Sequence, residues 1–125
     1  MYLQTAIGNF SIVADKNRKG VFLVRSRVKK DIDNFCHLSD LKERVIYQNQ
    51  YSDYKYRIFV NHDVLIRFFF TYIANLNYTN FKAEIERLCS KNKKERWRIG
   101  LVYDIYTSIA THSRDYNEEK KIQTS

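Results

Sequence analysis

The hydrophobic period of this chain changes after residue 28, and that change constrains the fold more than any other feature. Residues 10–14 and 21–28 are two β-rich runs joined by a short polar loop that ends in Gly20, a pattern typical of a β-hairpin. Residues 2–7 can pair with this hairpin as a further strand. From Lys29 onward, most apolar residues recur at helical spacing. The sequence therefore predicts a small sheet followed by a mainly helical half.

The middle of the chain predicts helices and one more strand. Residues 29–38 read as a helix, and residues 41–46 as a second short helix capped by Ser39 or Asp40. Residues 51–60 alternate as a strand, and we expect the face that carries Tyr54, Tyr56, Ile58 and Val60 to pack on the helices.

The C-terminal half predicts three helices. The first covers residues 62–76 with Asn61 as its N-cap, the second begins after Thr79 or Asn80, and the third covers about residues 96–110. The fold class is therefore α+β, with helices on one face of an antiparallel sheet of three to four strands, in the order ββαβααα. One variant of this class is a split β-α-β arrangement of the ferredoxin-like type, although the C-terminal half is too helical for a complete one.

Length and composition indicate one domain. The chain has 125 residues and a net charge of +8, and we expect a single domain over residues 1–112 with a frayed polar tail over 113–125. Cys36 and Cys89 are remote in sequence and form no C-x-x-C motif, as expected for reduced thiols in a cytoplasmic protein. We expect neither a signal peptide nor a membrane span.

Strand parity predicts a basic sheet face. Arg25 and Arg27 share one face of their run, and Lys55 and Arg57 share a face of the strand at 51–60. If these two strands are neighbours, the four cations form a patch on the open side of the sheet, where two of them could hold one phosphate. With Phe59 nearby, this resembles the sheet platforms that bind single-stranded RNA. Pairing with Asp53 and solvation of an exposed face would explain the same charges without a ligand.

A second basic feature surrounds the single tryptophan. The segment 91–98 carries several cations around Trp97, which suits phosphate contact combined with base stacking. A core role for Trp97 beside a solvated loop is the alternative. The candidate binding residues are those of the two basic features together: Arg25, Arg27, Lys55, Arg57, Lys93, Lys94, Arg96 and Arg98.

The sequence favours binding over catalysis. The histidines show no metal-ligand spacing, and the carboxylates are few and scattered, so we expect no metal and no cofactor. No phosphate-cradling glycine motif is present. A metal-independent nuclease could still use His62 or Tyr56 as acid or base with Arg57 on the phosphate.

Several short motifs support a resemblance. The motifs N-F-S-I-V at 9–13, V-R-S-R-V at 24–28, D-Y-K-Y-R-I at 53–58 and N-Y-T-N-F-K at 77–82 occur in this order. In these the chain resembles a widespread group of small bacterial and mobile-element proteins, over about residues 8–106. The resemblance implies one domain and gives no catalytic residues.

Three functions follow as hypotheses. The first is a non-catalytic protein that binds RNA or single-stranded nucleic acid through the basic sheet face. The second is a protein–protein inhibitor or adaptor, for example a phage-encoded anti-defence or anti-CRISPR protein acting on a nucleic-acid-handling complex, because exposed tyrosine and arginine are frequent in protein interfaces. The third is the metal-independent nuclease. The partners expected are nucleic acid or such a complex, without a membrane, and a homodimer is possible.

Overall fold

The computed structural model describes residues 1–42 and 45–124, with side chains to residue 118. Residues 1–77 form one compact unit, and the chain from residue 78 onward forms a second. Each unit has its own buried residues and is described by itself.

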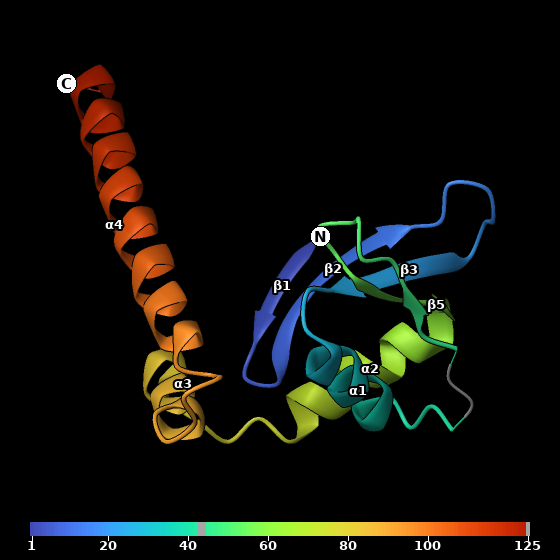
Figure 1. Ribbon diagram of the computed structural model, residues 1–125. Helices are drawn as coiled ribbons and strands as arrows, with labels where there is room; N and C mark the ends of the chain where they lie inside the picture. The colour runs from blue at the N-terminus through green and yellow to red at the C-terminus, as the bar shows by residue number, and fades with distance from the viewer. Residues whose placement is uncertain (43–44, 125) are drawn as a thin grey trace. The chain divides into compact units, whose positions relative to one another are not determined.

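The first unit is built on an antiparallel sheet (Figure 1). Its strands are β1 (Tyr2–Thr5), β2 (Gly8–Ala14), β3 (Val21–Ser26), β4 (Tyr47–Gln48) and β5 (Tyr56–Asn61). They lie in the order β1-β2-β3-β5-β4, and every neighbouring pair is antiparallel. The predicted hairpin and its additional N-terminal strand are confirmed. The sheet has five strands among the described residues, so it is wider than expected.

A glycine controls the turn between β1 and β2. Gly8 has φ +148°, and a Cβ atom at this position would lie 2.5 Å from Cγ of Asp31. Asp31 is buried, and its carboxylate accepts a hydrogen bond of 3.1 Å from the backbone N–H of Asn9. The close approach of the turn to α1 (Lys29–Leu38) therefore requires a residue without a side chain.

Two helices cover one face of this sheet. Helix α1 and helix α2 (His62–Ala74) both lie on that face. The side chain of Asn61 accepts a hydrogen bond of 3.0 Å from the backbone N–H of Val64, which confirms the predicted N-cap of α2. The helix ends at Ala74, two residues earlier than expected.

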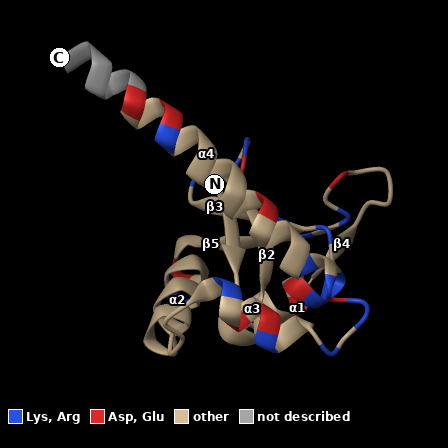
Figure 2. Ribbon diagram, turned by 90° about the vertical axis from the view of Figure 1, so that its left-hand side faces the viewer, with Lys and Arg blue, Asp and Glu red and all other residues tan. Residues whose placement is uncertain are grey.

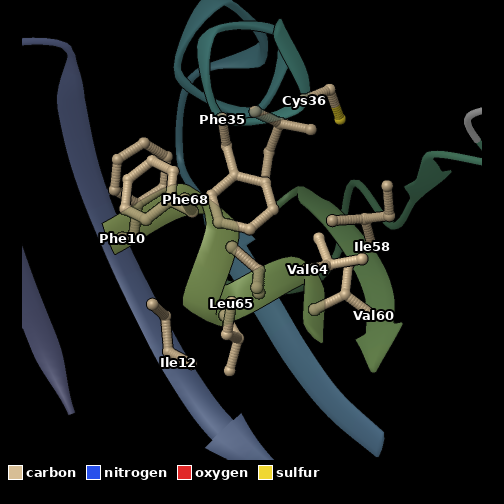
Figure 3. Close-up of a cluster of buried hydrophobic side chains, with 11 residues drawn as sticks. Phe10, Ile12, Phe35, Cys36, Ile58, Val60, Val64, Leu65 and Phe68 are labelled. Atoms are coloured by element: carbon tan, nitrogen blue, oxygen red, sulfur yellow. The ribbon is translucent and has the colours of Figure 1, made fainter. Parts of the chain in front are cut away.

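Aromatic rings fill the centre of the core (Figure 3). Phe10 of β2 lies 5.9 Å from Phe35 of α1 and 5.8 Å from Phe68 of α2, measured between ring centroids. Phe35 and Phe68 are 4.5 Å apart. All three side chains are fully buried, so they join the sheet and both helices into one core.

The prediction of a strand over residues 51–60 was wrong in its first half. Residues 51–55 form turns, because side chains in the loop bind the backbone donors that a strand would pair. The side chain of Asn49 accepts from the N–H of Tyr51 at 3.1 Å, and Ser52 Oγ accepts from the N–H of Tyr54 at 3.2 Å. As a result Tyr54 lies outside the strand and is not part of the helix-facing side.

The short helix predicted over residues 41–46 is also wrong where the structure describes it. Residues 41, 42, 45 and 46 are not helical, while residues 43 and 44 lie outside the described residues. The chain then runs into β4, in which Tyr47 pairs with Arg57 of β5.

The second unit contains helices α3 (Phe81–Cys89) and α4 (Trp97–Thr124), which pack on each other. Asn80, and not Thr79, caps α3 by accepting from the N–H of Ala83 at 3.0 Å. Ile85, Cys89 and Val102 are buried. Helix α4 is longer than expected, and its backbone is helical where we predicted a frayed tail from residue 113.

Candidate functional site

The face of the sheet opposite α1 and α2 carries a continuous row of polar and aromatic residues. Strand register places Arg25 directly opposite both Ser11 and Arg57, and Arg57 also opposite Tyr47. Tyr2 extends the row through its pairing with Ser11. We call this set the outer row: Tyr2, Ser11, Arg25, Arg57 and Tyr47. Strands β3 and β5 are neighbours, which was the condition for the predicted basic patch, and the register places Arg25 and Arg57 of that patch opposite each other.

The two arginines of the outer row have no carboxylate partner. Among the described residues, no Asp or Glu forms an ion pair with Arg25 or Arg57, including Asp53, which the sequence offered as a partner. Like charges directly opposite each other on neighbouring strands destabilise a sheet. The pair is therefore a concentration of positive charge that the fold does not neutralise.

Hydrogen bonds fix one side of each guanidinium. Arg25 donates from Nη2 to Ser11 Oγ at 2.8 Å, and Arg57 donates from Nη2 to Ser52 Oγ at 2.8 Å and to the carbonyl oxygen of Tyr54 at 3.3 Å. The Nε atoms of both arginines are buried and have no acceptor among the described residues. The Nη1 groups also lack a protein acceptor there, and they are not fully buried.

Tyr54 holds two of the predicted cations. Its ring centroid lies 4.8 Å from Cζ of Arg25 and 4.7 Å from Cζ of Arg27, which are cation–π distances. Arg27 follows the end of β3 and is exposed, as is Lys55, which precedes β5. The loop over residues 51–55, which was predicted to be part of a strand, thus brings the ring of Tyr54 to Arg25 and Arg27.

A further arginine joins this face without having been predicted. Arg18, in the β2–β3 loop, places its Cζ 4.5 Å from the ring centroid of Phe59, whose ring meets that of Tyr47 at 5.7 Å. Arg18 also pairs with Asp15 at 2.9 Å, and this hydrogen bond, the largest contribution, lowers the pKa of the Asp15 carboxyl below its ordinary value. The sequence feature that could have pointed to Arg18 is its spacing of three residues from Asp15 within the predicted hairpin loop.

The second predicted basic feature is divided by its own contacts. Lys93, Lys94 and Arg96 are exposed, and Arg96 donates from Nε to the carbonyl oxygen of Ser90 at 2.8 Å. Arg98 is buried, pairs with Glu95 at 2.5 Å, and lies over the ring of Trp97 at 4.6 Å. The charge of Arg98 is thus locally neutralised, whereas the exposed cations beside it are available to solvent. Lys and Arg occur in both units (Figure 2), so net charge alone does not select a site.

The residues suggested for a nuclease are not brought together. Tyr56 packs against the core, while its neighbour Arg57 belongs to the opposite face of β5. His62 begins α2 and lies 6.1 Å from the ring of Phe22. An acid–base group within hydrogen-bond reach of a phosphate on Arg57 is therefore not supplied by either residue.

An apolar groove lies along the exposed side of α2. Its volume is about 670 Å³, and its lining is almost entirely hydrocarbon. Ile66, Phe70 and Ile73 of this helix are exposed by 53%, 73% and 64%. An uncovered stripe of this size is typical of interaction surfaces.

No group of three or more His, Cys, Asp and Glu side chains is arranged to hold a metal ion in the part of the chain that the structure describes. Within residues 1–42 and 45–124, no helix combines the length and apolar character that crossing a bilayer requires.

No match exists. No protein-family model, no curated protein and no solved structure matches the chain. The resemblance to small bacterial and mobile-element proteins stays a prediction, and function has to be argued from the chemistry of the site.

Proposed function

We propose that this protein is a non-catalytic binding protein that contacts RNA or single-stranded nucleic acid through the outer row. The observation that carries the proposal is the Arg25–Arg57 pair, two cations that face each other without a carboxylate among the described residues and whose Nη1 donors have no protein acceptor there. Phosphate backbones attract such groups and supply most of the affinity in sequence-independent binding.

Aromatic residues beside the cations support the same ligand. Tyr47 is half-exposed and flanks Arg57, and Phe59 lies on the same face. Proteins that bind single strands combine a basic surface with rings on which bases stack, and each stacked base contributes about 1–3 kcal/mol. The arrangement favours an unpaired strand, because bases in a duplex have no free ring face to offer.

The cost of the pair to the fold also favours a binding role. A buried donor without an acceptor costs about 1–3 kcal/mol, and both Nε atoms are in this position. Solubility alone does not require such a cost, because a lysine with its head in water would serve equally well.

A salt titration tests the proposal. The intact protein is mixed with fluorescently labelled single-stranded RNA and DNA of mixed sequence, and anisotropy is measured at several salt concentrations. We expect micromolar binding at low salt, with log K falling by about 0.7 per phosphate contact for each tenfold rise in salt. The absence of binding at low salt would contradict the proposal.

A matched pair of variants locates the site. Arg25→Glu/Arg57→Glu and Lys93→Glu/Lys94→Glu change the net charge equally, but the first alters the sheet and the second the basic loop of the other unit. We expect the sheet variant to lose at least about tenfold in affinity and the loop variant to lose clearly less. Circular dichroism confirms that both variants are folded. Equal losses would mean that net charge, and not the outer row, drives binding.

The apolar groove favours one other function, that of a protein-binding inhibitor or adaptor. A nucleic-acid ligand does not explain the exposure of Ile66 and Phe70, whereas an apolar side chain of a protein partner does. The distinguishing result is nuclease-resistant binding to one nucleic-acid-handling complex that Ile66→Asp/Phe70→Asp abolishes. Binding that survives this change and is lost in the sheet variant would exclude a role for the groove.

A further inference from the structure

We propose that the Arg25–Arg57 pair is a site for one phosphate group, held jointly by the two Nη1 donors, with the adjoining base stacked on Tyr47. The inference rests on the proposed function for its natural occupant, and it deepens that function by assigning the position of one nucleotide. The ligand that this site requires is a tetrahedral phosphate group linked to a planar base.

The register brings the two guanidiniums within reach of one anion. Arg25 and Arg57 are direct cross-strand partners, and Cβ atoms of such partners lie about 4.5–5.5 Å apart. A phosphate has several acceptor oxygens, so it can take charge-assisted hydrogen bonds from both side chains at once. Binding would also remove the repulsion between the two cations.

Existing contacts prepare both side chains for this role. The Nη2 group of Arg25 is held by Ser11 and that of Arg57 by Ser52, both at 2.8 Å, and the ring of Tyr54 lies against Arg25. These contacts reduce the number of positions that the remaining Nη1 donors can take. A site ordered before binding loses less conformational entropy when the ligand arrives.

No carboxylate of the described residues competes for the site. Asp15 is occupied by Arg18 in the neighbouring loop, and Asp53 is exposed without an ion pair. An external anion is therefore the available counter-charge for the two arginines.

The residues around the arginine pair place an aromatic ring beside the bound phosphate. The next row of the same face consists of Val13, Leu23 and Phe59, which offer no donor side chain. Tyr47 lies next to Arg57 on the other strand, and its ring is half-exposed. A base joined to the bound phosphate can therefore stack on Tyr47.

The test uses Arg→Lys variants of the full chain, because lysine keeps the charge but lacks the planar set of donors. Arg25→Lys/Arg57→Lys alters the site, and Arg87→Lys/Arg114→Lys makes the same change at exposed positions in the other unit. The ligands are inorganic phosphate, and labelled oligonucleotides with a 5′-phosphate or a 5′-hydroxyl. Arginine side-chain NMR and anisotropy at constant ionic strength follow binding.

We expect inorganic phosphate to shift the resonances of Arg25 and Arg57 saturably, and the site variant to weaken this binding about tenfold or more while the control variant binds normally. Tighter binding of the 5′-phosphate oligonucleotide would identify a terminal phosphate as the occupant, and equal binding an internal one. Both results support the site.

Failure of the site and failure of the proposed function give different results. Salt-dependent oligonucleotide binding with no saturable phosphate shift, and with the site variant equal to wild type, would overturn the phosphate site and leave the proposed function standing. Saturable phosphate binding that the site variant loses, without oligonucleotide binding, would support the site and overturn the nucleic-acid function. Circular dichroism of the site variant checks its fold, and the wild-type titration decides the question if that variant is unfolded.

Discussion

Replacing Tyr54 with alanine removes the ring against which Arg25 and Arg27 both lie, at 4.8 and 4.7 Å from its centroid. Each cation–π contact near the surface contributes about 0.5–1 kcal/mol, so we expect Tyr54→Ala to lower the free energy of unfolding by about 1–2 kcal/mol. The backbone hydrogen bonds of Tyr54 to Ser52 and Arg57 remain possible in the variant. The loss is therefore assigned to the ring.

Hydrogen exchange of the β3 amides measures this effect within the first unit. Tyr51→Ala is the matched control, because Tyr51 lies in the same loop and its side chain is 91% exposed. We expect the control to change stability by less than about 0.5 kcal/mol and Tyr54→Phe to resemble wild type, since the ring is kept. If Tyr54→Ala costs no more than Tyr51→Ala, the ring does not support the arginines and the reasoning is refuted.

Two other variants test the fold. Gly8→Ala should destabilise the protein by roughly 2–4 kcal/mol in urea unfolding, because the new Cβ would clash with Asp31 and because alanine rarely adopts this positive φ. Gly100→Ala, in α4, should instead stabilise the protein by about 0.5–1 kcal/mol, because there is open space around this position. In the second unit, the hydrogen bond that the Tyr103 hydroxyl donates to Glu86 raises the pKa of that hydroxyl above its ordinary value. The contribution of this hydrogen bond to stability is therefore complete below the unfolded pKa of about 10 and is lost as pH rises through the higher folded pKa. Glu86→Ala should bring the pKa of Tyr103, measured by NMR, down toward the ordinary value. An unchanged pKa in this variant would contradict the assignment.

Much of the fold could be predicted because its signals are local. The hairpin follows from alternating residues around Gly20, and the caps at Asn61 and Asn80 follow from their side chains at helix starts. The errors arose where side chains form hydrogen bonds with backbone groups that would otherwise pair in a strand. Asn49 and Ser52 bind backbone donors within a segment that alternates like a strand, and alternation alone does not reveal this.

The site was predicted in part for a related reason. Strand parity placed Arg25 and Arg57 on one face, and only the strand order was needed to make them neighbours. The contribution of Tyr54 depended on a loop returning to the sheet, which periodicity does not encode. The same applies to Arg98, whose pairing with Glu95 requires the turn that starts α4. Counting charges in the segment 91–98 therefore overestimated its free positive charge.

The composition of the outer row supports the proposal that the two arginines bind a ligand. Residues of the neighbouring row, Val13, Leu23 and Phe59, follow the usual preference of strands for β-branched, aliphatic or aromatic side chains. Arg25 and Arg57 depart from it, because they place like charges opposite each other and leave both Nε donors buried without acceptors. Local departures that cost stability are expected where a protein binds its partner. A phosphate would remove the repulsion and accept from the remaining Nη1 donors, so the same feature that weakens the free sheet would strengthen the complex.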